Sequence, residues 1–200
     1  MIFNSIFKKK PFVLLYHGIT NFLHEDPIDQ FLYRNLIPED NFIKHMKYLN
    51  SIFFLEDLSE INDFNQVREN TIFIQFDDGY KNNLKCIDII NDIFKKNNCT
   101  IFIPSSYLAY DQLTIDTVKL SLIMLKGDFK DDRINFSGKN YSMNSVEDKL
   151  NSYQIIRYKL KRSNTKNRIE SYKYIFSQKI NSTIEELLDL ESDFKLLNIK

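Results

Sequence analysis

Two adjacent carboxylates, Asp77 and Asp78, are the clearest candidates for chemistry, because they directly follow the apolar run 71–76 and precede Gly79. Functional groups gather at the carboxyl ends of strands in parallel sheets, where two neighbouring carboxylates need a counter-charge. Side chains alternate along a strand, so one carboxylate can coordinate a cation while the other accepts a proton from bound water. Gly79 permits a tight turn beside them. The pattern predicts a metal site or a general base.

Three other interpretations of the acidic pair compete with this one. Asp77 and Asp78 can simply cap a helix that starts near Asn82, since Asp is a favoured N-cap residue. A magnesium-binding strand of a P-loop enzyme has a similar ending, but the glycine-rich phosphate-binding motif is absent and the chain holds only 4 glycines. A phosphoaspartate site of the receiver type stays open, although the Thr and Lys that would complete it cannot be placed.

The three histidines, His17, His24 and His45, all lie in the first quarter of the chain. A metal site that uses a histidine from the later three quarters is therefore excluded. His17 ends the first apolar run and could approach Asp78. We expect His24 to be solvent-exposed in an acidic turn, and His45 to pack or to form a hydrogen bond from its helix.

The hydrophobic pattern predicts the elements that position these residues. Short apolar runs bounded by turn residues indicate strands at 12–16, 71–76 and 99–104, with a further short one at 51–55. Apolar side chains at helical spacing predict one helix from residue 39, after a loop that runs to Pro38. They predict a second helix after residue 82, with Leu84, Ile87, Ile90 and Phe94 on its core face. Strands alternating with helices indicate a buried parallel sheet with right-handed crossovers.

Beyond residue 108 the pattern becomes mostly helical. We expect a small hairpin at 133–141 and helices at 118–125, 146–160, 168–180 and 184–197. The chain is therefore divided into an α/β part over 1–108 and a helical annex over 109–200. The cationic run 159–162 is interpreted as a solvated helix face, because nearby acids offset it and no aromatic platform is interleaved.

Composition indicates a soluble globular protein of 200 residues in which 27 basic and 27 acidic side chains cancel. No overall field favours nucleic acid or an anionic membrane, so any binding must come from a local site. Neither a signal peptide nor a transmembrane segment is expected. Cys86 and Cys99 lack the spacing of a zinc knuckle or redox pair, which favours buried thiols and a reducing, cytoplasmic location.

Four ordered signatures point to a known family. They are the run Leu14-Leu15-Tyr16-His17-Gly18-Ile19, the spacing Phe42-x-x-His45-x-x-x-Leu49, the strand end Phe76-Asp77-Asp78-Gly79-Tyr80 and the run Cys99-Thr100-Ile101-Phe102-Ile103-Pro104. In this order and spacing, residues 10–108 resemble the polysaccharide deacetylases, the NodB-homology family of carbohydrate esterases. The resemblance implies a distorted (β/α) barrel, here partial and followed by the helical annex.

The resemblance also implies a reaction and roles for individual residues. The family removes N-acetyl, or less often O-acetyl, groups from a polysaccharide or lipid-linked sugar with a divalent metal, most often zinc. Asp77 would be the catalytic base and Asp78 a metal ligand. Tyr80 would lie near the substrate, and His17 would face the same pocket as a ligand or substrate contact.

The chain departs from the family where the metal site should be completed. The family's later His-x-x-x-His motif has no counterpart, because no histidine follows His45, and Gln75 replaces the usual Thr or Ser. We expect the N-terminal part of a deacetylase, cut before its second motif and inactive or incomplete alone; His17 and His24 are candidates to rebuild the site. The alternative is a non-catalytic remnant that binds glycan or pairs with a chain supplying the missing barrel half.

Overall fold

The computed structural model describes residues 10–21, 25–103, 116–129 and 131–178. Contacts divide these residues into two units. The first contains residues 10–21 and 33–103, and the second contains residues 25–32 and 116–178. The boundary expected at residue 108 and the helix expected over 184–197 lie outside the described residues.

A parallel sheet with β5 (Thr71–Phe76) at its centre forms the first unit. β5 pairs with β1 (Phe12–Tyr16) from Ile72 to Phe76, with β4 (Phe54–Leu55) at its first two residues, and with β6 (Cys99–Ile101) at its last three. The strands expected at 12–16 and 71–76 and the mixed α/β class with a parallel sheet are thus confirmed, whereas the strands expected at 51–55 and 99–104 are shorter, at 54–55 and 99–101. The described strands form an open sheet and close no barrel.

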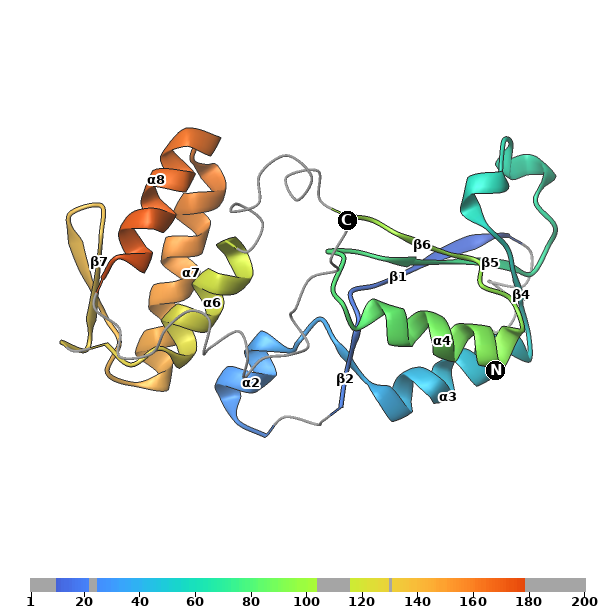
Figure 1. Ribbon diagram of the computed structural model, residues 1–200, viewed down its shortest axis with the longest axis horizontal. Helices are drawn as coiled ribbons and strands as arrows, with labels where there is room; N and C mark the ends of the chain where they lie inside the picture. Colours follow the sequence, from blue (N-terminus) through green and yellow to red (C-terminus); the bar gives the residue numbers. More distant parts are fainter. Residues whose placement is uncertain (1–9, 22–24, 104–115, 130, 179–200) are drawn as a thin grey trace. The chain divides into compact units, whose positions relative to one another are not determined.

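Two helices, α3 (Glu39–Asn50) and α4 (Asn83–Phe94), cover one face of this sheet (Figure 1). α3 carries acids in its first turn, where they suit the positive end of the helix dipole. α4 ends at Lys95, which adopts the left-handed conformation with φ 56°. Two short 3-10 helices, η1 (Leu58–Glu60) and η2 (Phe64–Gln66), connect β4 to β5.

The core of the first unit lies between the sheet and these two helices. Ile72, Ile74 and Phe76 alternate along β5 and are at most 1% exposed. They share one cluster with the expected face of α3, Phe42, Met46 and Leu49, and with Cys86 and Ile90 of α4. On the opposite face Val13 and Leu15 are 42% and 52% exposed, so the prediction of a buried sheet was wrong for alternate residues of β1.

The predicted core face of α4 was also partly wrong. Leu84 is 48% exposed, whereas Asn83, Cys86 and Ile90 are fully buried. The buried positions still follow helical spacing, but the helix is rotated relative to the pattern that begins at Leu84. The side chains that pack against the sheet, rather than the most apolar stripe, define this face.

The segment predicted as a loop up to Pro38 contains further structure. β2 (Ile19–Thr20) pairs in parallel with β3 (Ile37–Pro38). α2 (Pro27–Leu32) groups with the second unit, and Asp26 accepts the Ile28 N–H at 2.8 Å at its start. The Asp-Pro pair is a typical helix start that the sequence analysis missed.

The second unit is mostly helical, as expected. It contains α6 (Asp116–Lys126), the antiparallel hairpin of β7 (Arg133–Phe136) and β8 (Lys139–Ser142), α7 (Val146–Arg162) and α8 (Thr165–Phe176). Ser145 and Asn164 cap α7 and α8 with their side chains, and Lys126 pairs with Asp29 of α2 at 2.7 Å. Among the described helices none is long and apolar enough to cross a membrane.

Candidate functional site

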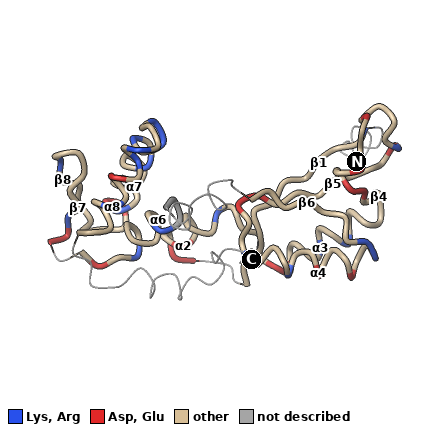
Figure 2. The backbone as a smooth tube through the Cα atoms, turned by 45° about the horizontal axis from the view of Figure 1, so that its top comes forward, with Lys and Arg blue, Asp and Glu red and all other residues tan. Residues whose placement is uncertain are grey.

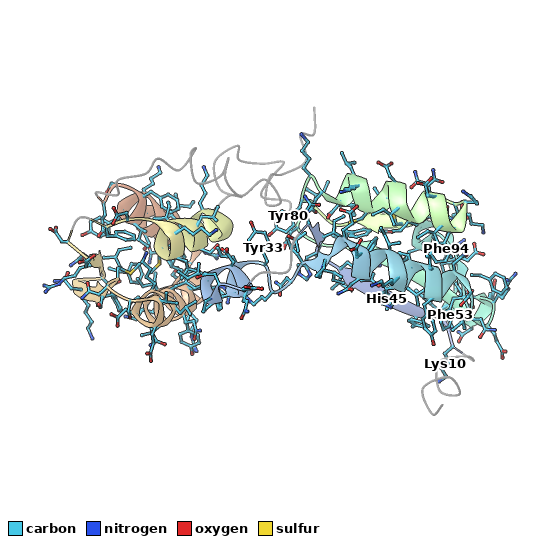
Figure 3. All side chains as sticks on the ribbon, turned by 90° about the horizontal axis from the view of Figure 1, so that it is seen from below. Lys10, Tyr33, His45, Phe53, Tyr80 and Phe94 are labelled. Atoms are coloured by element: carbon cyan, nitrogen blue, oxygen red, sulfur yellow. The ribbon has the colours of Figure 1, made fainter. Side chains whose placement is uncertain are left out.

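The candidate residues lie at the carboxyl edge of the β1–β5 pair. Tyr16 is in register with Phe76, and the Asp77 N–H donates to the Tyr16 carbonyl oxygen at 2.9 Å. His17 and Asp77 therefore leave the sheet at neighbouring positions. Figure 3 shows Tyr80 at the end of the first unit opposite to Phe53 and Phe94. The fold thus gathers at one edge residues that the sequence assigned to two separate strands.

A tight turn carries the acidic pair. Asp78 and Gly79 both have positive φ, 70° and 64°, which matches the central residues of a type I′ turn, for which Asp-Gly is a favoured sequence. A side chain is uncommon in this conformation and costs about 1 kcal/mol. Because β5 ends at Phe76, the strand alternation assumed for both acids does not reach Asp78.

The acidic pair does not occupy the capping position of the following helix. α4 begins at Asn83, and its N-cap residue is Asn82. The interpretation of Asp77 and Asp78 as simple N-caps was therefore wrong. Both carboxylates are half-buried in the turn that precedes the helix.

A contact that the sequence analysis missed joins the two strand ends. The Asn82 Nδ2 donates to the Ile19 carbonyl oxygen at 2.8 Å. Gly18, with φ 151°, lies against the same amide, and a Cβ at this position would meet Asn82 Oδ1 at 2.3 Å. The turn after β5 is thereby held against the chain that leaves β1, and glycine alone fits at position 18 without a shift.

Asn83 is a second missed residue. It is fully buried at the first position of α4, and its side-chain amide has no hydrogen-bond partner among the described residues. Buried polar atoms are nearly always paired, so this amide is unusual. Its sequence context gave no signal, because a polar residue in a first helical turn is normally exposed.

The donor set can be compared with the needs of a catalytic zinc, which normally has three protein ligands. Among the described residues no group of three or more His, Cys, Asp or Glu side chains could hold a metal ion. His17 and Asp78 would supply at most two donors, His24 lies outside the described residues, and His45 is engaged elsewhere. These residues do not fit a catalytic zinc site by themselves.

His45 bonds to the first strand from α3. Its Nδ1 lies 2.9 Å from the Tyr16 hydroxyl, and the two rings meet edge to face. Burial lowers the pKa of His45 below its ordinary value, and burial, with a smaller effect of Cys86, raises that of Tyr16. With a neutral imidazole the tyrosine hydroxyl can donate to Nδ1, which supports the expected hydrogen-bonding role of His45 rather than metal ligation.

Acidification is expected to remove stability through His45. Its folded-state pKa lies below the ordinary 6.5, so the unfolded chain binds the proton first. The contribution is complete above the unfolded pKa and is lost as pH falls through the folded pKa. Urea unfolding of wild type and His45→Gln from about pH 8 to about pH 5 checks this, because glutamine keeps an acceptor for Tyr16 without titrating. An identical pH dependence in both proteins would contradict the assignment.

Both cysteines are free, with Cys86 buried and Cys99 half-buried, as expected for structural thiols. Burial is the main cause that raises the pKa of Cys86 to about 12 and that of Cys99 to about 11. Both groups are therefore thiols at neutral pH, which makes them poor nucleophiles and poor metal ligands.

Neither the protein-family models nor the curated proteins compared with this chain give a match. Solved structures that do match include one described as a polysaccharide deacetylase from Bacillus anthracis and a polysaccharide deacetylase from Bacillus cereus. Each match has 27% identity, a TM-score of 0.37, and covers 48% of this chain and 29% of the other. Over about half its length, this chain is similar to polysaccharide deacetylases, the family indicated by its motifs.

Proposed function

We propose that this chain is a polysaccharide deacetylase-like protein that binds an acetylated glycan at the carboxyl edge of β1 and β5. The register of β1 with β5 carries the proposal, because it puts His17 beside the turn of Asp77 and Asp78. The motif resemblance supplies the substrate class, an N-acetylated polysaccharide or lipid-linked sugar. The same resemblance supports a barrel of the NodB type, of which the described sheet would be one part.

In this proposal Asp77 is the general base and Tyr80 lies beside the glycan. Hydrolysis adds water to the acetyl carbonyl; the proton that Asp77 accepts returns to the leaving amine, and acetate is released. Asp78 and His17 are two donors toward a divalent metal, zinc in most family members. These two donors do not complete a catalytic zinc site, which normally has three protein ligands. We therefore expect little or no acetate release from this chain alone.

A second candidate function is a non-catalytic protein that binds glycan or complements a partner chain. The exposed side of the sheet favours it, because Val13 and Leu15 of β1 and Phe54 of β4 are 42–52% exposed on the face away from α3 and α4. A partner that covered this face would bury apolar side chains.

Calorimetry of the full chain with an oligomer of N-acetylglucosamine, with and without zinc, tests the proposal. We expect saturable glycan binding that Asp77→Ala weakens about tenfold, the usual order for a lost charged hydrogen bond. The matched control is Asp88→Ala, on the exposed surface of α4. Absence of oligomer binding would overturn the proposed function. Zinc-dependent acetate release by this chain alone would overturn the conclusion that its metal site is incomplete.

A further inference from the structure

The junction of α7 with α8 concentrates positive charge. Residues 157–168 hold six cations and no acid, whereas the rest of the chain has 21 basic against 27 acidic side chains. We call these six residues the basic corner: Arg157, Lys159, Lys161, Arg162, Lys166 and Arg168. Figure 2 shows the blue segments gathered at this end of the helix pair. A chain with no net charge thus carries a cationic local surface, in which the three lysines and Arg162 are exposed and Arg157 and Arg168 are half-buried.

The charges of the basic corner are not used in ion pairs within the described parts of the chain. Lysine and arginine at the end of α7 suit the negative end of that helix. Lys166, however, lies in the first turn of α8, which contains no acid, and a cation there opposes the helix dipole. Helix stability alone therefore does not account for the cluster.

The cations of the run 159–162 are exposed, as expected for a solvated face, but exposed apolar and aromatic groups lie among them. Ile155 and Tyr158, one turn apart on α7, are 47% and 59% exposed. The Arg162 guanidinium lies 5.1 Å from the Tyr158 ring centroid and donates to its hydroxyl. Lys159 Nζ lies 5.5 Å from the Tyr141 ring centroid and donates to that hydroxyl at 2.7 Å.

This arrangement distinguishes between two kinds of anionic partner. Single-stranded nucleic acid is bound by stacking successive bases on several aromatic rings, but α7 offers one exposed ring, Tyr158, because its other tyrosine, Tyr153, is buried. Helices that lie in a membrane interface combine exposed aliphatic and tyrosine side chains with lysine and arginine, as α7 does. The observations favour a lipid surface.

We propose that the basic corner, with Ile155 and Tyr158, docks the second unit on an anionic membrane surface. The cations contact phospholipid phosphates, while Ile155 and Tyr158 enter the headgroup boundary. Each cation that approaches an anionic leaflet increases partitioning about fivefold. This docking needs no spanning helix and does not depend on the deacetylase assignment.

Cosedimentation of the full chain with vesicles containing about one-third phosphatidylglycerol in phosphatidylcholine, at low salt, tests the proposal. Reversing two exposed cations, Lys161→Glu with Lys166→Glu, is expected to reduce partitioning by roughly 30-fold or more. The matched control, Lys44→Glu with Lys47→Glu, makes the same charge change at exposed positions of α3 and should bind nearly as wild type. High salt should weaken wild-type binding. Circular dichroism verifies that each variant is folded.

Several results would overturn the proposal. Equal binding to pure phosphatidylcholine vesicles would exclude headgroup charge as the cause. Tighter binding to a single-stranded oligonucleotide, or displacement by millimolar inorganic phosphate, would identify a different anion. Failure of the full chain to bind these vesicles at low salt would also overturn the proposal.

Discussion

Phe76→Ala is expected to lower the free energy of unfolding of the first unit by about 3–5 kcal/mol. Phe76 is fully buried at the end of β5, with ring centroids 5.9 Å from Tyr16 and 6.3 Å from Phe42. Its ring thus packs against β1 and α3 at once, and truncation leaves a cavity that these elements cannot fill. Because Phe76 directly precedes Asp77, the same change should weaken glycan binding.

Peptide-resolved hydrogen exchange measures this effect in each unit separately, since a chain with two units need not unfold in one step. Protection of β5 should fall steeply while that of α7 changes little. Phe102→Ala is the matched control, because Phe102 is 47% exposed and its truncation should cost less than about 1 kcal/mol. If both variants lose equal protection in β5, the packing attributed to Phe76 is wrong.

The strands and helices of the first unit could be predicted because local pattern and tertiary burial agree there. Phe42, Met46 and Leu49 recur at helical spacing and are buried together. The apolar residues of β5 lie at the centre of a sheet, where almost any continuous apolar run is compatible with burial. Prediction succeeded where a residue's own neighbours along the chain determine its environment.

The local hydrophobic pattern gave wrong predictions where contacts between residues far apart in the sequence determine which side chains are buried. α4 buries the polar Asn83 and exposes Leu84, because its orientation is set by packing against the sheet. α2 has only six residues, so its apolar periodicity is too short to detect, although its Asp26 cap was visible. The exposure of Val13 and Leu15 depends on whether another element covers the second face of the sheet. The sequence of β1 alone does not determine this.

The candidate site also combines features that the sequence predicts with features that it does not predict. Asp77 and His17 could be placed at one edge, because each follows an apolar strand and parallel strands align their carboxyl ends. The Asp-Gly pair made the left-handed φ of Asp78 foreseeable. It did not reveal that the alternation of side chains along β5 stops before Asp78. The contact of Asn82 with Gly18 spans 64 positions in the sequence, and no spacing rule reaches across it.

That contact gives the second large expected effect. Gly18→Ala should destabilise the first unit by about 3 kcal/mol, because φ 151° is strained for any side chain and the new Cβ would lie 2.3 Å from Asn82 Oδ1. The Asn82 amide cannot turn away freely, since it is bonded to the Ile19 carbonyl oxygen. The clash should separate the end of β1 from the turn of Asp77. We therefore expect Gly18→Ala to weaken glycan binding as well as to lower the stability of the first unit.

A double-mutant cycle separates the steric part from the backbone part. Asn82→Ala alone should cost about 1 kcal/mol for its lost hydrogen bond. In that background Gly18→Ala should cost clearly less than in wild type, because the atom it strikes is gone and only the backbone strain persists. Gly138→Ala, at φ 73° with no atom within 4 Å of the new Cβ, estimates the cost of a positive φ without a clash.

Additive single effects, measured by peptide-resolved exchange, would show that Asn82 and Gly18 are not coupled. The two strand ends would then be aligned by the sheet alone, and His17 would owe its place beside Asp77 to the register of β1 with β5.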